Sequence, residues 1–245
     1  MQPEEYRTMF EVEETLWWYR GLRRIVFLFL RPYLRSGQKL RILDAGCGTG
    51  ILLTHLSSLG QTWGFDYAEE ALSFCRQRGL KNIRQASITA IPFAAESFDL
   101  VTCLDVLSCQ AVEDDELALR EIYRVLRRGG LAIINLAAHR FLYSSHDRAT
   151  RTARRYSRRE VQQKAKRAGF SVLRLSYWNF FLFPAVAVTR LLRKGATERT
   201  TSDLRLPHPL LNSFLDRIVA LEALLLRYVD LPLGSSIIGV LRKED

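Results

Sequence analysis

The stretch ILDAGCGTG, residues 42 to 50, places three glycines within five positions directly after a short apolar run. Glycine adopts positive φ without strain and lets a ligand approach the backbone closely. A strand that ends in such a corner and leads into a helix is typical of ligand-binding loops at the carboxyl edge of an α/β sheet. The corner therefore predicts a sheet with a binding site at one edge.

Apolar runs of strand length alternate with helical patterns through the middle of the chain. This alternation predicts a parallel sheet that is covered by helices on both faces. The expected strands are 41–46, 62–66, 82–87, 98–107, 131–137, 170–178 and 235–243. The expected helices are 51–60, 68–79, 114–130 and 157–169, and a capping box opens the last of them. The fold class is therefore α/β, with a Rossmann-like, mostly parallel sheet of seven strands.

The segments on either side of this core have a different pattern. Residues 1–39 are rich in aromatic side chains and helical in pattern, which predicts an N-terminal helical leader. Residues 40–178 are expected to form the core, 179–233 a helical insertion or lid, and 234–245 the last strand. We expect all of them to belong to a single domain, residues 1–245.

The insertion is apolar, but its pattern does not indicate a membrane span. Its run 180–188 is interrupted by Pro184 and is far shorter than the ~20 residues that cross a bilayer. Helices that lie on a surface or close over a pocket fit this composition. Its second half is amphipathic, and one face carries Leu211, Phe214, Leu215, Ile218, Leu221 and Leu225.

The chain carries a net charge of +10, and its positive charge is clustered. Residues 20–41 hold seven basic residues and no acid, and residues 148–167 hold nine basic residues and one acid. Such clusters suit phosphate, nucleic acid or an anionic membrane surface, and a merely solvated face has the same composition. Charge alone therefore leaves the partner open.

The cysteines and the N-terminal stretch indicate in which cellular compartment the protein is expected. Cys47, Cys75, Cys103 and Cys109 show neither a metal-binding nor a disulfide spacing, which is typical of reduced thiols. The acidic N-terminal stretch MQPEEYRTMFEVEE lacks the apolar run of a secretory signal. We expect a cytoplasmic protein without a metal site, and contact with the inner membrane surface stays open.

Two acids near the glycine corner indicate the ligand. The corner reads Gly-x-Gly-x-Gly, whereas dinucleotide-binding loops read Gly-x-Gly-x-x-Gly. Asp44 precedes the glycines, where it would repel a pyrophosphate but suit an ammonium or sulfonium group. Asp66 ends the next expected strand, where an acid accepts hydrogen bonds from ribose hydroxyls. A nucleoside with a positive end and no phosphate is S-adenosylmethionine.

Several stretches resemble, in order and spacing, the motifs of class I S-adenosylmethionine-dependent methyltransferases. The resemblance covers roughly residues 40–178 and implies a methyltransferase with S-adenosylmethionine as cofactor and S-adenosylhomocysteine as product. The matching stretches are ILDAGCGTG, GFDYAEEAL, IPFAAESFDLVTCLDVL and EIYRVLRRGGLAIIN.

The resemblance assigns roles at the cofactor's methionine end. Asp44 and the carbonyl of Gly46 would hold the amino group. Gly48 and Gly50 have no side chains that would block the approach of the cofactor. Arg20 lies in the leader, which often covers the cofactor in this fold. Its guanidinium would pair with the methionine carboxylate, or it would lie on the surface of a leader that only packs on the core.

The resemblance also assigns roles at the nucleoside end and beside the methyl group. Asp66 would bind the ribose, and Tyr67 would pack against adenine. Ser87 stands where the family usually has an aspartate for the adenine amine, and a serine accepts that bond more weakly. The backbone N–H of Ile88 would face the adenine ring. Leu104 and Asp105 would lie beside the methyl group.

Further stretches, most of them at or beyond the ends of the core, resemble a bacterial subgroup with a Trp-Trp-x-x-Gly-x-Arg leader. They are LWWYRGLRRIV, SSHDRATRTARRYSRRE, YWNFFLFP and LPLGSSIIGVLRK. Members of the subgroup are linked with saccharide, lipid-linked and natural-product pathways. His146 lies in the second of these stretches, where it would act as a base or bind substrate, or else form a structural hydrogen bond.

The residues after the fourth expected strand narrow the class of acceptor. Relatives that methylate amino groups of DNA carry Asn/Asp-Pro-Pro-Tyr there, and this chain has LDVLSCQ. We therefore expect a small-molecule acceptor, hydrophobic or lipid- or saccharide-linked, under a roof made by the leader and the insertion, and nucleic acid is disfavoured. O-, N- and C-methylation stay open, as does the oligomeric state.

Two alternatives remain at this point. One is an RNA methyltransferase that uses the basic face. The other is a non-catalytic protein that binds S-adenosylmethionine, since Ser87 departs from the family and Ser108-Cys109 stand where relatives often have Glu-His.

Overall fold

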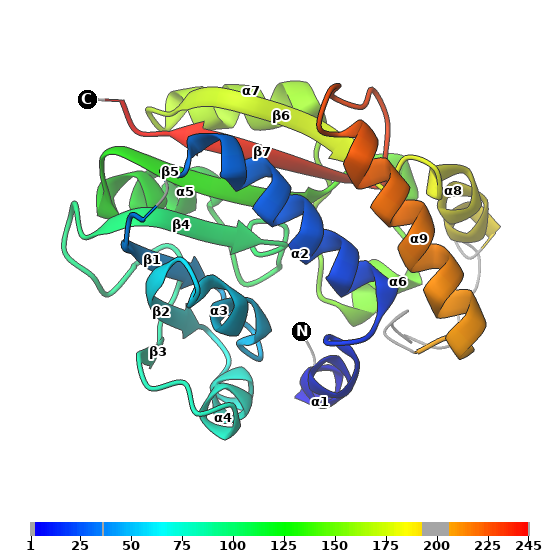
Figure 1. Ribbon diagram of the computed structural model, residues 1–245, viewed down its shortest axis with the longest axis horizontal. Helices are drawn as coiled ribbons and strands as arrows, with labels where there is room; N and C mark the ends of the chain where they lie inside the picture. Colours follow the sequence, from blue (N-terminus) through cyan, green and yellow to red (C-terminus); the bar gives the residue numbers. More distant parts are fainter. Residues whose placement is uncertain (1–2, 36, 193–205, 245) are drawn as a thin grey trace.

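Seven strands form one sheet at the centre of the computed structural model, which describes residues 3–35, 37–192 and 206–244 (Figure 1). The strand order is β3-β2-β1-β4-β5-β7-β6, and only β7 runs antiparallel to its neighbours in this described sheet. The predicted fold class is confirmed. The strands are β1 (Leu40–Ala45), β2 (Gly60–Asp66), β3 (Ile83–Gln85), β4 (Phe98–Leu104), β5 (Leu126–Ala137), β6 (Ser171–Trp178) and β7 (Ser236–Arg242).

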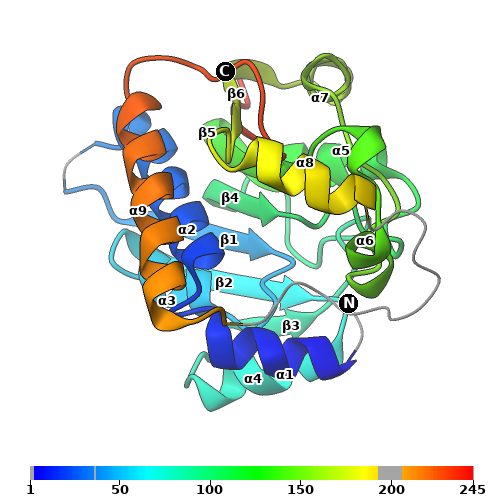
Figure 2. The same ribbon diagram turned by 90° about the vertical axis from the view of Figure 1, so that its right-hand side faces the viewer.

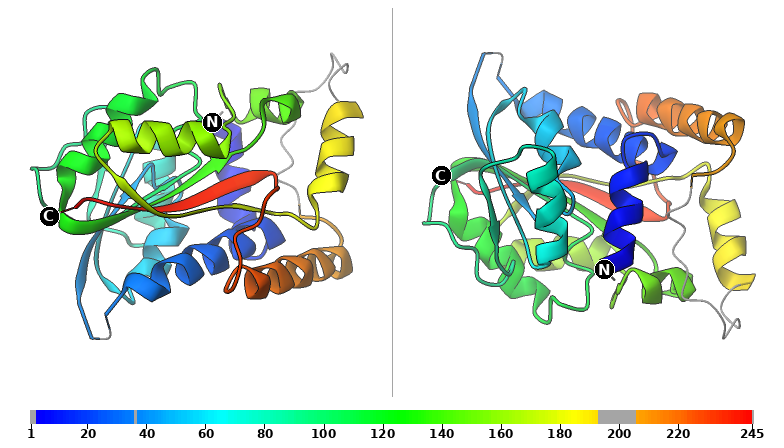
Figure 3. Two further views of the ribbon diagram at one scale, coloured as in Figure 1. Left: turned by 90° about the horizontal axis from the view of Figure 1, so that it is seen from above. Right: turned by 90° about the horizontal axis from the view of Figure 1, so that it is seen from below.

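Helices cover both faces of the sheet, and each face has its own apolar core (Figure 3). On one face, α2 (Trp17–Leu30), α3 (Ile51–Leu56) and α9 (Pro209–Leu225) pack on the sheet, and α4 (Glu69–Gln77) lies beside α3. On the other face lie α5 (Asp115–Val125) and α7 (Arg158–Arg167). Two packed faces leave the ends of the strands as the places where a ligand can reach the sheet.

Two predicted helix ends are wrong, and glycines lie near both. The strand expected over 98–107 also ends early, at Leu104, because Asp105 has a φ of 60°. The helix expected over 114–130 ends at Val125, and β5 already begins at Leu126, with Gly129 at a φ of 72°. Gly60 was expected to end a helix, but α3 stops at Leu56 and Gly60 begins β2. A Cβ on Gly60 would lie 2.0 Å from the carbonyl oxygen of Leu40, so the pairing of β1 with β2 needs a glycine there.

The leader begins with α1 (Pro3–Val12), which lies beside α4 below the sheet edge formed by β2 and β3 (Figure 2). Phe10 stacks on Phe74 of α4 with ring centroids 4.8 Å apart. Just after α1, the buried carboxylate of Glu13 accepts hydrogen bonds from the Thr49 hydroxyl and from Arg78. These contacts hold α1 against the glycine loop. The leader then continues through α2 and η1 (Arg31–Tyr33) to β1.

The remaining helices lie at the end of the sheet where the parallel strands finish (Figure 2). They are η2 (Arg140–Leu142), α6 (Ser145–Ala149) and α8 (Phe183–Leu192), with one end of α9 beside them. The predicted insertion falls partly on residues 193–205, which lie outside the described residues. Among the residues that the structure describes, no helix combines the length and apolarity needed to cross a bilayer.

Candidate functional site

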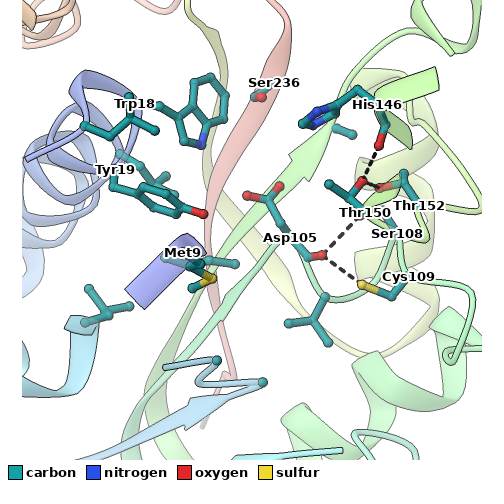
Figure 4. Close-up of a pocket in the computed structure, with 18 of the residues that line it drawn as sticks. Met9, Trp18, Tyr19, Asp105, Ser108, Cys109, His146, Thr150, Thr152 and Ser236 are labelled. Atoms are coloured by element: carbon teal, nitrogen blue, oxygen red, sulfur yellow. Dashed lines mark hydrogen bonds between the residues drawn. The ribbon is translucent and has the colours of Figure 1, made fainter. Parts of the chain in front are cut away.

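A cavity of about 390 Å³ opens at the carboxyl edge of β1, β2 and β4 (Figure 4). The glycine loop forms one end of it, and the leader, the end of β4, α6 and α8 form the other walls. Its lining includes Tyr6, Met9, Trp17, Trp18, Tyr19, Leu22, Arg23, Asp44, Gly46, Gly48, Asp66, Leu104, Asp105, Ser108, His146, Asp147, Arg155, Asn179, Val186, Arg190 and Ser236.

The glycine loop turns through left-handed backbone at the cavity. Gly46, Gly48 and Gly50 have φ values of 80°, 53° and 86°, and the backbone N–H groups of Gly46 and Cys47 donate to the carbonyl of Phe65. A Cβ on Gly46 would lie 2.3 Å from Val106 Cγ2. Gly46 therefore needs to be glycine for two reasons, the positive φ and the close approach of the end of β4.

Asp44 is a buried carboxylate at the start of this loop. Burial raises its pKa to about 7; the hydrogen bond from the Thr102 hydroxyl, 2.5 Å long, lowers it, and nearby Asp66 raises it again. A carboxylate held this way gains most from a cationic partner, because the partner would restore its charged form. Asp44 lines the cavity, so that partner can be a ligand.

Asp66 lies across the loop from Asp44, at the end of β2. It accepts hydrogen bonds from the backbone N–H groups of Gly48 (2.9 Å) and Ala68 (3.0 Å). Burial raises its pKa, and these two bonds oppose the rise. The carboxylate thus joins the glycine loop to the turn after β2, and it borders the cavity.

The residues predicted to meet adenine lie just outside the main cavity. Tyr67 is exposed, and it lines a separate shallow depression with Gln85, Ala86 and Ser87. The Ser87 hydroxyl lies 2.8 Å from the Thr89 hydroxyl and accepts from the Thr89 backbone N–H. Ile88 is buried behind them. The residues predicted to meet adenine therefore lie together near the end of β3, next to Asp66.

The leader helix brings an arginine to the cavity, but a different one from the arginine predicted. Arg20 and Arg24 are one turn apart on α2, and both pair with Asp216 of α9. Arg23 lines the cavity instead, and its guanidinium donates to the carbonyl of Glu13, 2.6 Å away. The periodicity of α2 fits the difference, because Tyr19 and Arg23 lie one turn apart on a side of the helix that is rotated by about 100° from the side with Arg20 and Arg24.

Asp105 projects into the middle of the cavity from the end of β4 (Figure 4). It has a φ of 60°, which is uncommon outside glycine. Asn135 Nδ2 lies 2.9 Å from each of its carboxylate oxygens, and its backbone carbonyl accepts from Ser108 and Cys109. Burial raises its pKa to about 6, against the lowering effects of Asn135 and Arg155. Strained backbone held by several hydrogen bonds is common at functional sites.

Two of the tryptophan-containing stretches of the sequence meet behind Asp105. Trp178 at the end of β6 donates from Nε1 to Asn135 Oδ1 at 2.7 Å, and Asn135 in turn donates to Asp105. Trp18 of the leader stacks on Trp178, with ring centroids 4.5 Å apart. Packing of the leader on the core therefore also supports the residue that orients Asp105.

The wall opposite the leader is polar and charged. His146 and Asp147 come from α6, and their side of the cavity also includes Arg155 and, from α8, Arg190. Arg155 pairs with Asp147 at 2.8 Å, while Arg190 donates to the Ser144 hydroxyl at 3.0 Å. His146 points into the cavity (Figure 4). A substrate with polar groups would find donors and acceptors on this wall.

The structure thus brings together most of the predicted site. Asp44, Gly46, Gly48, Asp66, Leu104, Asp105 and His146 all line the cavity. Tyr67 and Ser87 line the neighbouring depression, while Gly50, Ile88 and Arg20 line neither. The cavity is also lined by residues that the sequence did not predict: Tyr6, Met9, Arg23, Asn179 and Ser236. Helical spacing in the leader could have found the first three.

Comparison with known proteins agrees with this geometry. The family model described as "Methyltransferase domain" matches residues 43–134, from β1 through most of β5. Residues 43–134 therefore hold a methyltransferase domain, in a chain with the fold of S-adenosylmethionine-dependent methyltransferases.

Two curated relatives match the central part of the chain. A malonyl-(acyl-carrier protein) O-methyltransferase of Enterobacter lignolyticus is 40% identical over 102 residues, 40% of this chain and 39% of the relative. A ubiquinone biosynthesis O-methyltransferase of Pseudomonas fluorescens is 35% identical over 97 residues, 37% of this chain and 41% of the relative. The chain therefore spans about two fifths of the length of these relatives.

A solved structure extends the likeness to the whole methyltransferase fold. A S-adenosylmethionine-dependent methyltransferase of Thermotoga maritima has a TM-score of 0.61 at 18% identity. The match covers 98% of this chain and 95% of that one. At this identity the likeness concerns the fold.

Proposed function

We propose that the protein transfers a methyl group from S-adenosylmethionine to a small acceptor with an apolar, lipid-linked or saccharide-linked part. One observation carries the proposal: a single cavity joins the glycine loop to a polar wall, with Asp105 between them. A cofactor site and an acceptor site that share one cavity are what direct group transfer needs.

The cofactor end has the donor and acceptor groups that S-adenosylmethionine requires. Asp44 would hold the ammonium group, because burial raises the pKa of this carboxyl group and a cationic partner would favour its charged form. Asp66 would accept from the ribose, and Tyr67 would cover the adenine in the depression beside it. Arg23, rather than Arg20, is the leader arginine at the cavity.

Methyl transfer also needs a site that excludes water and aligns the acceptor with the methyl group, and a base that takes the acceptor's proton. When bound, the cofactor supplies a methyl group on a positively charged sulfur. The apolar side chains of Trp17, Trp18 and Leu22 exclude water from that region, which favours a step in which charge disappears. Asp105 would take the proton of an acceptor hydroxyl, and His146 is the other candidate base.

The names of the curated relatives support an oxygen acceptor, because both are O-methyltransferases. The leader contributes the apolar side of the cavity, as proposed from the sequence. Of the described residues of the insertion, Asn179 and, from α8, Val186 and Arg190 line the cavity, whereas none from α9 does. The acceptor would therefore lie between the leader, α6 and α8.

The basic clusters give little support to an RNA acceptor. Four basic residues of 148–167 are held in ion pairs within the protein: Arg154 and Lys164 with Asp115, Arg155 with Asp147, and Arg167 with Glu116. Arg20 and Arg24 are likewise paired with Asp216. Charges already satisfied inside the fold are less available for phosphates.

Calorimetry with S-adenosylmethionine and S-adenosylhomocysteine tests the cofactor assignment, with Asp66→Ala alongside. We expect micromolar binding that the substitution abolishes, and then turnover on an acceptor found by screening small apolar alcohols and acids. The matched control is Asp99→Asn, at the opposite end of β4, which should bind as the unmodified protein does. Intact protein that binds neither nucleoside would contradict the proposal, and binding without turnover on any acceptor would favour the non-catalytic alternative.

A further inference from the structure

The outer side of α8 and α9 exposes an unusual number of large apolar side chains. Both helices lie at the end of the molecule where the parallel strands finish (Figures 2 and 3). We call these residues the outer apolar face: Val188, Leu191 and Leu192 of α8, Leu210, Leu211, Phe214, Leu221, Leu224 and Leu225 of α9, and Tyr228 and Val229 just after it. Single exposed apolar residues are common, but a group on neighbouring helices indicates an interaction surface.

The orientation of α9 is the reverse of that of an ordinary surface helix. Its buried side carries two acids, Asp216 and Glu222, together with Val219 and Ala223. Asp216 pairs with Arg20 and Arg24 of α2. Glu222 accepts from the backbone N–H groups of Asn179, Phe180 and Phe181. These polar contacts fix the helix with its apolar stripe turned outward, so the exposure follows from specific inward contacts.

The unpaired charges beside this face are positive. Within 183–192 and 206–230, Asp216 and Glu222 are buried, and Arg217 and Arg227 are exposed. Asp230, just after Val229, is exposed but pairs with Arg174 at 2.7 Å. An apolar face flanked by arginines, with its neighbouring acid already paired, is complementary to a negatively charged apolar layer. Phe214 and Tyr228 add aromatic side chains, which favour the boundary between lipid and water.

A second copy of this chain fits the face less well. Symmetric pairing would set the same patch against itself and bring Arg217 and Arg227 near their own copies, while the neighbouring acid Asp230 is already paired with Arg174. We propose that the outer apolar face docks this protein on the surface of an anionic lipid bilayer.

The location of the face gives the docking a consequence for catalysis. Val186 and Arg190 of α8 line the cavity, while Val188, Leu191 and Leu192 of the same helix belong to the outer apolar face. Docking would therefore bring the α8 wall of the cavity to the lipid. The entry of a lipid-linked acceptor past α8 rests on the proposed function. Docking on the bilayer does not depend on it.

Vesicle co-sedimentation of the full chain tests the docking. We expect binding to vesicles of phosphatidylcholine mixed with phosphatidylglycerol, and weaker binding to phosphatidylcholine alone. Phe214→Ser with Leu221→Ser should lower the partition coefficient at least about tenfold, since both side chains would leave the lipid. Arg217→Gln with Arg227→Gln should lower it about fivefold per arginine, on anionic vesicles only.

The control is Leu117→Ser, an exposed leucine of α5 on the other face of the sheet, which should leave partitioning unchanged. S-adenosylmethionine binding by each variant, measured by calorimetry, should also stay unchanged, which separates a failure of docking from a failure of the cofactor assignment. Absence of binding to both vesicles, or equal binding by the Phe214/Leu221 double variant, would overturn the proposal. So would a stable dimer in solution that the same double variant converts to monomer.

Discussion

The two ends of the cavity are built in different ways. At the cofactor end, Asp44, the three glycines and Asp66 come from one short stretch of chain and are joined largely by backbone hydrogen bonds. At the acceptor end, Asp105 depends on Asn135, Trp178 and Trp18, which come from three distant parts of the chain. A local motif can bind a common cofactor, while the acceptor site is particular to the way this chain packs.

This difference predicts that substitutions at the two ends have separable effects. Cofactor-end variants should lose binding of S-adenosylmethionine, and with it all turnover. Acceptor-end variants should bind the cofactor normally and lose turnover alone.

The largest effect is expected for Asp105→Asn. The amide keeps the shape of the carboxylate but cannot take a proton, so turnover should fall by about 10²–10⁴. Affinity for S-adenosylmethionine, measured by calorimetry, should stay unchanged. The control, Asp99→Asn, lies at the other end of the same strand and should leave both quantities unchanged. Nearly full turnover by Asp105→Asn would instead assign the proton to His146, and lost cofactor affinity would show that the two ends are not separable.

The next effect is expected for Gly46→Ala. The new Cβ would meet Val106 in a residue that must keep positive φ, so the free energy of unfolding should fall by about 2–5 kcal/mol. Cofactor binding should be lost in the fraction that stays folded. Gly79→Ala is a matched control, since Gly79 has a φ of 78° but nothing within 4 Å of the added Cβ. It should cost only about 1–2 kcal/mol in denaturant unfolding and leave binding intact. Equal effects of the two substitutions would contradict the close contact at Gly46.

The smallest effect is a pH dependence of cofactor affinity. In the proposed cofactor site, the ionised form of Asp44 would bind the ammonium group, and burial raises the pKa of Asp44 to about 7. Affinity should therefore fall about tenfold per unit as the pH drops below 7. Above pH ~8 the amino group of the ligand loses its own proton, so affinity should peak between these values. Calorimetry across this range should show the acid limb disappear in Asp44→Asn.

As the pH falls, the stability of the ligand-free protein should rise, whereas its affinity for the cofactor should fall. The pKa of Asp44 is raised in the folded chain, so its contribution to stability is present at low pH and is lost as the pH rises through about 7. Asp105, with its pKa raised to about 6, acts in the same direction. Thermal unfolding with Asp44→Asn as the comparison measures this contribution. An affinity for the cofactor that rises as the pH falls would contradict the role given to Asp44.

The sheet and the cofactor end could be predicted from the amino-acid sequence alone. The periodicities of strands and helices are local properties of the sequence. The glycine motif is local too: one acid precedes the glycines and another ends the next strand, so it can be recognised without knowledge of distant contacts. The sequence therefore predicted the seven-stranded sheet, and it named Asp44, Gly46 and Asp66, which the structure places at one cavity.

The side of each flanking helix that faces the cavity was set by tertiary contacts. The pattern of α2 allowed Arg20 or Arg23 to point inward, and Asp216 on α9 draws Arg20 away. The apolar stripe of α9 was visible in the sequence, but burial of Asp216 and Glu222 turns it to the outside. A helical period fixes which residues share a face, whereas the partners of that face lie far along the chain and are known only once it has folded.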